Sequence, residues 1–123
     1  MPRILVVDDD ADIRDMLSFK LAKAGYEVHT EEDGETGLAA ARELSPDLIL
    51  LDWMMPRLTG PEVCRELRDD EATARVPVIL LTAKAQEADV QRGFATGAND
   101  YISKPFSPRE LMSRVQALLA RGA

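Results

Sequence analysis

Several polar residues that are able to do chemistry follow short apolar runs of the chain. They come directly after, or within two residues of, segments rich in Val, Ile and Leu: Asp8, Asp9, Asp52, Thr82 and Lys104. Three carboxylates brought close together repel one another, and a hard divalent cation with oxygen ligands relieves that repulsion. Beside such a cation a carboxylate can attack phosphorus, while an ammonium group and a hydroxyl stabilise the phosphoryl oxygens. These residue types therefore predict a phosphoryl-accepting site that holds a small cation such as Mg²⁺.

The apolar runs have the pattern of strands buried on both faces of a parallel sheet. Ile4–Val7, Leu48–Leu51 and Val78–Leu81 are continuous blocks of Val, Ile and Leu, which suit such strands. Tyr26–Thr30 and Asp100–Ser103 are two weaker strand candidates. In parallel sheets ligands bind beyond the carboxyl ends of the strands, so we expect the polar residues to converge at that edge.

Amphipathic segments alternate with these strands and predict five helices. Their bounds come from N-cap residues, prolines and glycines: Ile13–Ala24 before Gly25, Gly34–Leu44 after Asp33, a helix from Pro61 that ends among Asp69, Asp70 and Glu71, Gln86–Thr96 before Gly97, and a helix that starts with a capping box at Ser107–Glu110. Repeated β-α units with right-handed crossovers predict an α/β fold with helices on both faces of the sheet.

Each polar residue taken alone also has a structural explanation. Asp10 or Asp12 can cap the first helix, Thr82 can cap the fourth, and Lys104 can be a solvated side chain. The joint occurrence of such residues at four strand ends favours a functional site.

Composition narrows the functions that are open to the chain. The 123 residues suit a single globular domain, and a net charge of −7 disfavours direct contact with nucleic acid or a membrane. The single cysteine, Cys64, excludes an internal disulfide, and we expect it to be a small buried hydrophobic residue. Met1 leads into Ile4–Val7 without a cationic lead and a small-residue cleavage site, so we expect no secretory leader, and no apolar run approaches the ~18 residues of a membrane span. We expect a cytoplasmic protein.

Four segments together make the chain resemble response regulator receiver domains of bacterial two-component systems. They are Ile4–Asp10, Leu50–Pro56, Val78–Ala83 and Gly97–Phe106. The resemblance covers essentially the whole chain, so one receiver domain is expected over residues 1–123. It implies a flavodoxin-like, three-layer α/β sandwich, in which five helices cover a five-stranded parallel sheet of order 2-1-3-4-5.

The resemblance also implies a metal site and a phosphoacceptor. Asp52 would accept the phosphoryl group. Asp8, Asp9 and Asp52 would bind Mg²⁺, for which Mn²⁺ can substitute, and the backbone carbonyl of Met54 would complete the protein ligands.

Further residues would bind the phosphoryl group and change conformation with it. By resemblance Lys104 would pair with the phosphoryl group and Thr82 would donate a hydrogen bond to it. Tyr101 would fill the space that Thr82 vacates, and the peptide bond before Pro105 would be cis. The fourth helix, fifth strand and fifth helix would then present a changed face.

The same resemblance implies partners. A sensor histidine kinase or a histidine phosphotransfer domain would supply the phosphoryl group, and an output domain or downstream protein would contact the changed face. A phosphorylation-dependent homodimer is a further expectation, but Ala95, Asn99 and Gln116 stand where the DNA-binding subclass with a winged-helix output usually has charged residues. The domain would not be an enzyme beyond its own phosphorylation and dephosphorylation.

Two other functions compete with this interpretation. Asp8 and Asp10 form the Asp-x-Asp pattern of haloacid-dehalogenase-type phosphatases, although Asp12 stands where that family normally has Thr or Val. A flavin-binding sheet, or a receiver-like module that is never phosphorylated, is the second alternative. A flavin site needs a phosphate loop rich in small residues after the first strand, and an acidic turn does not suit it. His29 is the only histidine, and we expect it to face solvent.

Overall fold

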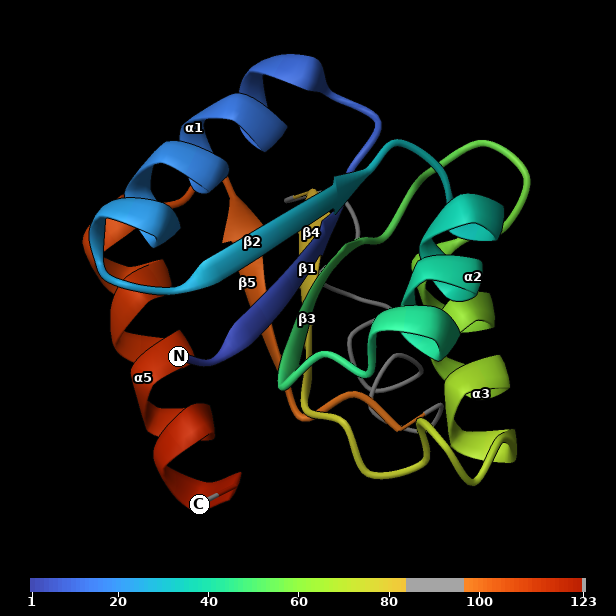
Figure 1. The fold of residues 1–123 in the computed structure, drawn as a ribbon. Helices are drawn as coiled ribbons and strands as arrows, with labels where there is room; N and C mark the ends of the chain where they lie inside the picture. The colour runs from blue at the N-terminus through green and yellow to red at the C-terminus, as the bar shows by residue number, and fades with distance from the viewer. Residues whose placement is uncertain (84–96, 123) are drawn as a thin grey trace.

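Five parallel strands form a single sheet at the centre of the structure (Figure 1). The computed structural model describes residues 1–83 and 97–122. The strands are β1 (Arg3–Val7), β2 (Glu27–Glu31), β3 (Leu48–Asp52), β4 (Val78–Ala83) and β5 (Asp100–Lys104). Their order across the sheet is β2-β1-β3-β4-β5, and every neighbouring pair is parallel. The predicted flavodoxin-like topology is confirmed.

Helices cover both faces of this sheet. In Figure 1, α1 (Ala11–Lys23) and α5 (Pro108–Gly122) lie on one side of it, and α2 (Gly34–Leu44) and α3 (Gly60–Asp69) lie on the other. The fourth helix predicted for residues 86–96 lies outside the described residues. None of the described helices combines the length and the apolar character that crossing a bilayer demands.

The three central strands, β1, β3 and β4, carry continuous apolar runs because each contributes to two separate cores. Along β3, Ile49 and Leu51 belong to the core under α2 and α3, whereas Leu48 and Leu50 belong to the core under α1 and α5. Adjacent residues of a strand point to opposite faces, so a sheet covered on both sides needs a continuous apolar run. Full burial of each such side chain stabilises the fold by about 1.5–3 kcal/mol.

Two strands extend further than their apolar runs predict. Asp52 is the last residue of β3 and pairs with Leu81, and Thr82 lies inside β4 and pairs with Ser103. Backbone pairing continues into the polar residues because the neighbouring strands also continue. Both side chains are therefore held by the sheet and not by a loop.

Capping residues fix the helix ends. The Asp10 carboxylate accepts hydrogen bonds from the N–H groups of Asp12 and Ile13, and the Asp33 carboxylate accepts one from Thr36. The predicted start of α3 was one residue late, because Thr59 caps the helix and forms a reciprocal capping box with Glu62.

The first turn of α5 contains half of the predicted capping box. The Ser107 hydroxyl accepts hydrogen bonds from the N–H groups of Arg109 and Glu110. The Glu110 carboxylate lies 3.3 Å from Arg114, one turn further along the helix.

Candidate functional site

Three carboxylates meet where β1 and β3 end. Asp8, Asp9 and Asp52 each offer an oxygen, and these three oxygens lie within 4.8 Å of one another. The convergence follows from the sheet, because Val7 of β1 pairs with Leu51 of β3 and the acidic residues come next. Asp8 and Asp52 are buried, while Asp9 is exposed. Oxygen atoms at this spacing, open to solvent on one side, suit a partly hydrated divalent cation.

Lys104 closes the cluster from the end of β5. Its ammonium nitrogen lies 3.0 Å from Asp8 Oδ2 and 3.1 Å from Asp52 Oδ1, so it bridges the two buried carboxylates. The other oxygen of Asp8 accepts a hydrogen bond from the Asp10 N–H at 2.9 Å. Among the residues that the structure describes, Lys104 thus supplies one positive charge against three carboxyl groups, which leaves room for a cation.

Burial and charge shift the ionisation of this cluster. Burial and the neighbouring Asp8 charge raise the pKa of Asp52 to about 7, although Lys104 acts in the opposite direction. Burial alone would lower the pKa of Lys104, but its hydrogen bond to Asp8 and the charge of Asp52 outweigh burial and raise this pKa. Without a bound cation Asp52 therefore holds its proton up to near-neutral pH.

Thr82 lies on β4, beside the strand that carries Asp52, and Tyr101 lies on β5, the next strand across the sheet. The Thr82 hydroxyl is buried and has no hydrogen-bond partner within residues 1–83 and 97–122. An unpaired buried hydroxyl costs about 1–3 kcal/mol, which a ligand oxygen would offset. Tyr101 is half-buried on β5, opposite Leu80, and packs against the core under α2 and α3. The Lys104–Pro105 peptide bond is cis, as the resemblance implied.

The backbone that follows Asp52 is fixed from two sides. The Trp53 N–H donates to the Leu81 carbonyl of β4 at 2.9 Å, and the Trp53 carbonyl accepts from the Gly60 N–H of α3 at 2.8 Å. A Cβ atom at Gly60 would lie only 2.5 Å from the Asp52 carbonyl oxygen, so α3 can approach this closely only through glycine. From the sequence, Gly60 indicates only a helix boundary, because the contact joins two segments that the fold brings together. Met54, next in the chain, is 59% exposed.

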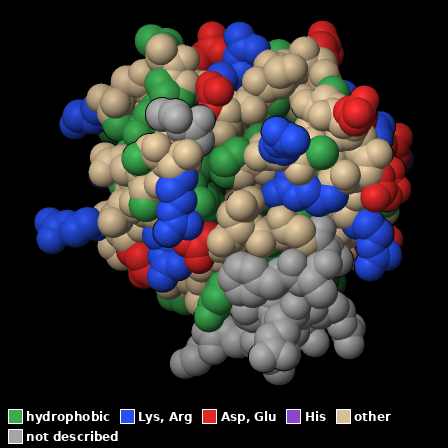
Figure 2. Space-filling model, turned by 90° about the horizontal axis from the view of Figure 1, so that it is seen from below, with side chains coloured by type: hydrophobic (Ala, Val, Ile, Leu, Met, Phe, Trp, Pro, Cys, Tyr) green, Lys and Arg blue, Asp and Glu red, His purple; other side chains and the backbone are tan. Residues whose placement is uncertain are grey.

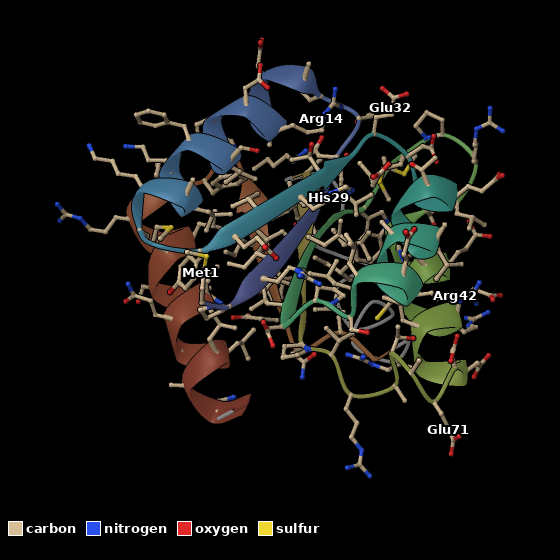
Figure 3. All side chains as sticks on the ribbon, in the orientation of Figure 1. Met1, Arg14, His29, Glu32, Arg42 and Glu71 are labelled. Carbon is tan, nitrogen blue, oxygen red and sulfur yellow. The ribbon has the colours of Figure 1, made fainter. Side chains whose placement is uncertain are left out.

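Asp10 and His29 lie outside the site. The Asp10 carboxylate is engaged at the start of α1, so the second carboxylate of the Asp-x-Asp pattern serves as a helix cap. His29 faces solvent on the edge strand β2 (Figure 3), where its Nε2 lies 2.6 Å from a Glu31 oxygen. Cys64 is fully buried, as predicted.

A hollow of about 550 Å³ lies away from the acidic cluster, at the amino-terminal edge of the sheet. It is lined by apolar residues such as Pro2, Pro77 and Leu119, and Figure 2 shows this edge of the molecule from below. Its carboxylate, Asp47, already accepts a hydrogen bond from the Arg3 N–H at 2.7 Å. The hollow offers no chemistry comparable with that of the carboxyl edge.

A flavodoxin-like sheet with clustered carboxylates and a lysine at its carboxyl edge defines a phosphoryl-accepting receiver. The family model of the response regulator receiver domain matches residues 4–116, and the chain belongs to this family. It is a receiver domain of a two-component response regulator and not a conventional enzyme, which rejects the phosphatase alternative.

Relatives support this assignment in sequence and in structure. The chain is 51% identical over 121 residues to the DNA-binding dual master transcriptional regulator RpaA of Synechocystis sp., a match that covers 98% of this chain and 50% of the relative. The chain thus spans about half the length of such relatives. The receiver domain of the Francisella response regulator 1452 superposes with a TM-score of 0.92 at 34% identity, over 100% of both chains.

A second solved structure concerns the metal. The receiver domain of the sensor histidine kinase PA1611 from Pseudomonas aeruginosa superposes with a TM-score of 0.89 at 34% identity, over 97% of this chain and 98% of that one. That protein carries a magnesium ion coordinated in its active-site cleft.

Proposed function

We propose that Asp52 accepts a phosphoryl group from a phosphohistidine, in a reaction that requires Mg²⁺. The observation that carries this proposal is the cluster of carboxylate oxygens within 4.8 Å of one another, with Lys104 in contact with Asp8 and Asp52. The donor is a sensor histidine kinase or a histidine phosphotransfer domain. The receiver domain extends over residues 1–123, and a cytoplasmic location stays a prediction from the sequence.

The residues at the carboxyl edge fit a magnesium ion. The ion would be held by carboxylate oxygens of Asp8, Asp9 and Asp52 and by the backbone carbonyl of Met54. Mn²⁺ can substitute for Mg²⁺ at such a site. When bound, the ion supplies positive charge against the carboxylates and the phosphoryl oxygens. The raised pKa of Asp52 supports this role, because it reflects burial and a nearby negative charge that a cation would balance.

The transfer itself depends on the chain's own side chains. A deprotonated carboxylate oxygen of Asp52 forms a bond to phosphorus as the bond from phosphorus to the imidazole nitrogen breaks. The electron pair of that bond stays on the imidazole. The Lys104 ammonium group neutralises charge on the phosphoryl oxygens, and the buried Thr82 hydroxyl, which has no partner among the described residues, donates a hydrogen bond to one of them.

Phosphorylation then changes the face that includes β5 and α5. When the Thr82 hydroxyl turns toward the phosphoryl group, Tyr101 moves into the space it leaves. The predicted fourth helix, β5 and α5 would present the altered surface to an output domain or a downstream protein. On this face Arg114 forms an ion pair with Asp100 of the same chain at 2.7 Å, so both of these charges are already engaged without a second copy. Dimerisation through this face stays a prediction.

Mapping the phosphorylated residue tests the proposal. The protein is incubated with a small phosphodonor and Mg²⁺, and the modified residue is identified by mass spectrometry. We expect the label on Asp52, no label in Asp52→Asn, and loss of labelling when EDTA is added. A label on Asp8 would instead support the phosphatase-like chemistry and contradict the assignment.

An apolar groove beside Lys104 offers a docking place for the phosphohistidine partner. The groove has a volume of about 370 Å³ and is lined by Ile13 and Met16 of α1 together with residues of the segment that follows β5, including Phe106. We expect Phe106→Ala to slow transfer from the protein donor and to leave transfer from a small phosphodonor unchanged. Phe19→Ala, an exposed apolar residue that is not part of the groove lining, is the control. Equal slowing with both donors would place Phe106 in the chemistry and not in docking.

A further inference from the structure

Arg14 reaches back from the start of α1 to the acidic turn. Its Nη1 donates a hydrogen bond to the backbone carbonyl of Asp8 at 2.7 Å, across six residues of sequence. Figure 3 shows Arg14 at the end of the molecule where the chain passes from β1 into α1. The resemblance gives no role to this residue, and its own charge is not part of the carboxylate cluster.

Asp8 is held at each of its polar groups. Its N–H donates to the Glu31 carbonyl at 3.1 Å, one carboxylate oxygen accepts from the Asp10 N–H, and the other contacts Lys104. The carbonyl that Arg14 binds belongs to the peptide unit between Asp8 and Asp9. A peptide unit is planar, so fixing its carbonyl also fixes the direction in which the chain enters Asp9.

We propose that Arg14 is a positioning residue for the cation site: it orients the Asp8–Asp9 peptide unit, and so places the Asp9 carboxylate within reach of an ion held by Asp8 and Asp52. This inference rests on the proposed Mg²⁺ site. Asp9 is the exposed member of the cluster, so its placement depends on the backbone more than on surrounding side chains. Side chains that orient metal ligands usually change metal affinity about 10–100-fold when they are removed.

An electrostatic role and a positioning role of Arg14 predict opposite changes in Mg²⁺ affinity when its side chain is removed. A guanidinium group near a dication repels it, so a purely electrostatic role predicts tighter Mg²⁺ binding after neutralisation. A positioning role predicts weaker binding, because the Asp8–Asp9 unit loses its only side-chain restraint on the carbonyl among the described contacts. The direction of the change in affinity therefore separates the two roles.

The packing around Arg14 favours a variant that folds. Arg14 is half-buried and lines an open hollow of about 280 Å³ together with Glu31 of β2, Glu32 between β2 and α2, and Thr36 of α2. Truncation at an already open hollow leaves no closed cavity in a core, so the cost in stability is small compared with a core substitution.

Titration calorimetry with Mg²⁺ alone tests the inference on the whole chain. We expect Arg14→Met to raise the Kd for Mg²⁺ roughly tenfold, and Arg14→Lys, which keeps a donor of similar reach, to recover part of the affinity. Lys20→Met on the exposed face of α1 is the matched control and should bind as the wild type does.

The outcomes separate this inference from the proposed function. Wild-type binding with an unchanged or lower Kd in Arg14→Met overturns the positioning role alone. A wild type that binds no Mg²⁺ overturns the proposed metal site and this inference with it. If Arg14→Met does not fold, Arg14→Gln, too short to reach the carbonyl, must show the same loss, and wild-type affinity in that variant contradicts the inference.

Discussion

At the scale of single residues, Asp52 combines burial with two unlike neighbours. The buried Asp8 disfavours its charged form, and Lys104 favours it, yet burial dominates and the pKa lies near 7. A nucleophile must be ionised to attack phosphorus, so additional positive charge at the cluster serves two purposes. It lowers the pKa of Asp52, so that the carboxyl group ionises, and it balances the negative charge on the phosphoryl oxygens.

The raised pKa of Asp52 predicts how stability depends on pH in the absence of metal. The folded protein binds the Asp52 proton more tightly than the unfolded chain, whose pKa is 3.8. The stability from this proton is complete below the unfolded value and is lost as pH rises through about 7. An asparagine side chain does not titrate, so the stability of Asp52→Asn does not fall with pH for this reason. In urea unfolding with EDTA, we expect the free energy of unfolding of the variant, relative to that of the wild type, to rise by up to about 1.4 kcal/mol per pH unit between the unfolded and the folded pKa. Parallel pH profiles would contradict the assigned pKa.

Met54 is expected to control the lifetime of the aspartyl phosphate. Its side chain is 59% exposed and comes two residues after Asp52, where it can hinder an attacking water molecule. We expect Met54→Asn to accelerate dephosphorylation several-fold, measured as the decay of the phosphorylated protein after the phosphodonor is removed. An unchanged decay rate would show that Met54 does not shield the phosphoryl group.

At the scale of elements, α3 holds the end of β3 through a contact that only glycine permits. Helix propensity alone predicts that Gly60→Ala stabilises α3, whereas the 2.5 Å approach to the Asp52 carbonyl predicts the reverse. We expect a loss of about 1–3 kcal/mol in the free energy of unfolding, together with slower phosphorylation. Arg65→Ala, on the exposed face of the same helix, is the control. A Gly60→Ala protein of wild-type stability and rate would show that α3 adjusts without cost.

The strands and most helix ends were predictable because their signals are local. Continuous apolar runs identified β1, β3 and β4, and Asp33 marked the start of α2. The capping box of α3 is equally local, and Thr59 with Glu62 three residues later is the signal that places the start of this helix at Gly60 and not at Pro61. By contrast, Arg68 binds the Gly97 carbonyl with two nitrogens, at 3.0 and 2.8 Å, across 29 residues. Contacts of that range depend on the assembled fold.

At the scale of the whole molecule, the topology itself brings the site together. Parallel strands with buried faces place all their carboxyl ends at one edge, so the meeting of Asp8, Asp52 and Lys104 could be predicted from the sequence. The details of the site could not. The bridge that Lys104 makes between two carboxylates, and the ionisation that follows, depend on distances of about 3 Å that no residue pattern specifies.

The central claim, that the three carboxylates share one cation, is tested most directly by thermal unfolding with and without Mg²⁺. An ion that binds only the folded protein at about a hundred times its Kd adds about 2.7 kcal/mol of stability, so we predict a clear rise in Tm for the wild type. Asp9→Ala should melt higher than the wild type without metal, because one repulsive charge is gone, and should gain much less from Mg²⁺. Equal Mg²⁺-dependent increments in the two proteins, or none in either, would contradict the shared site.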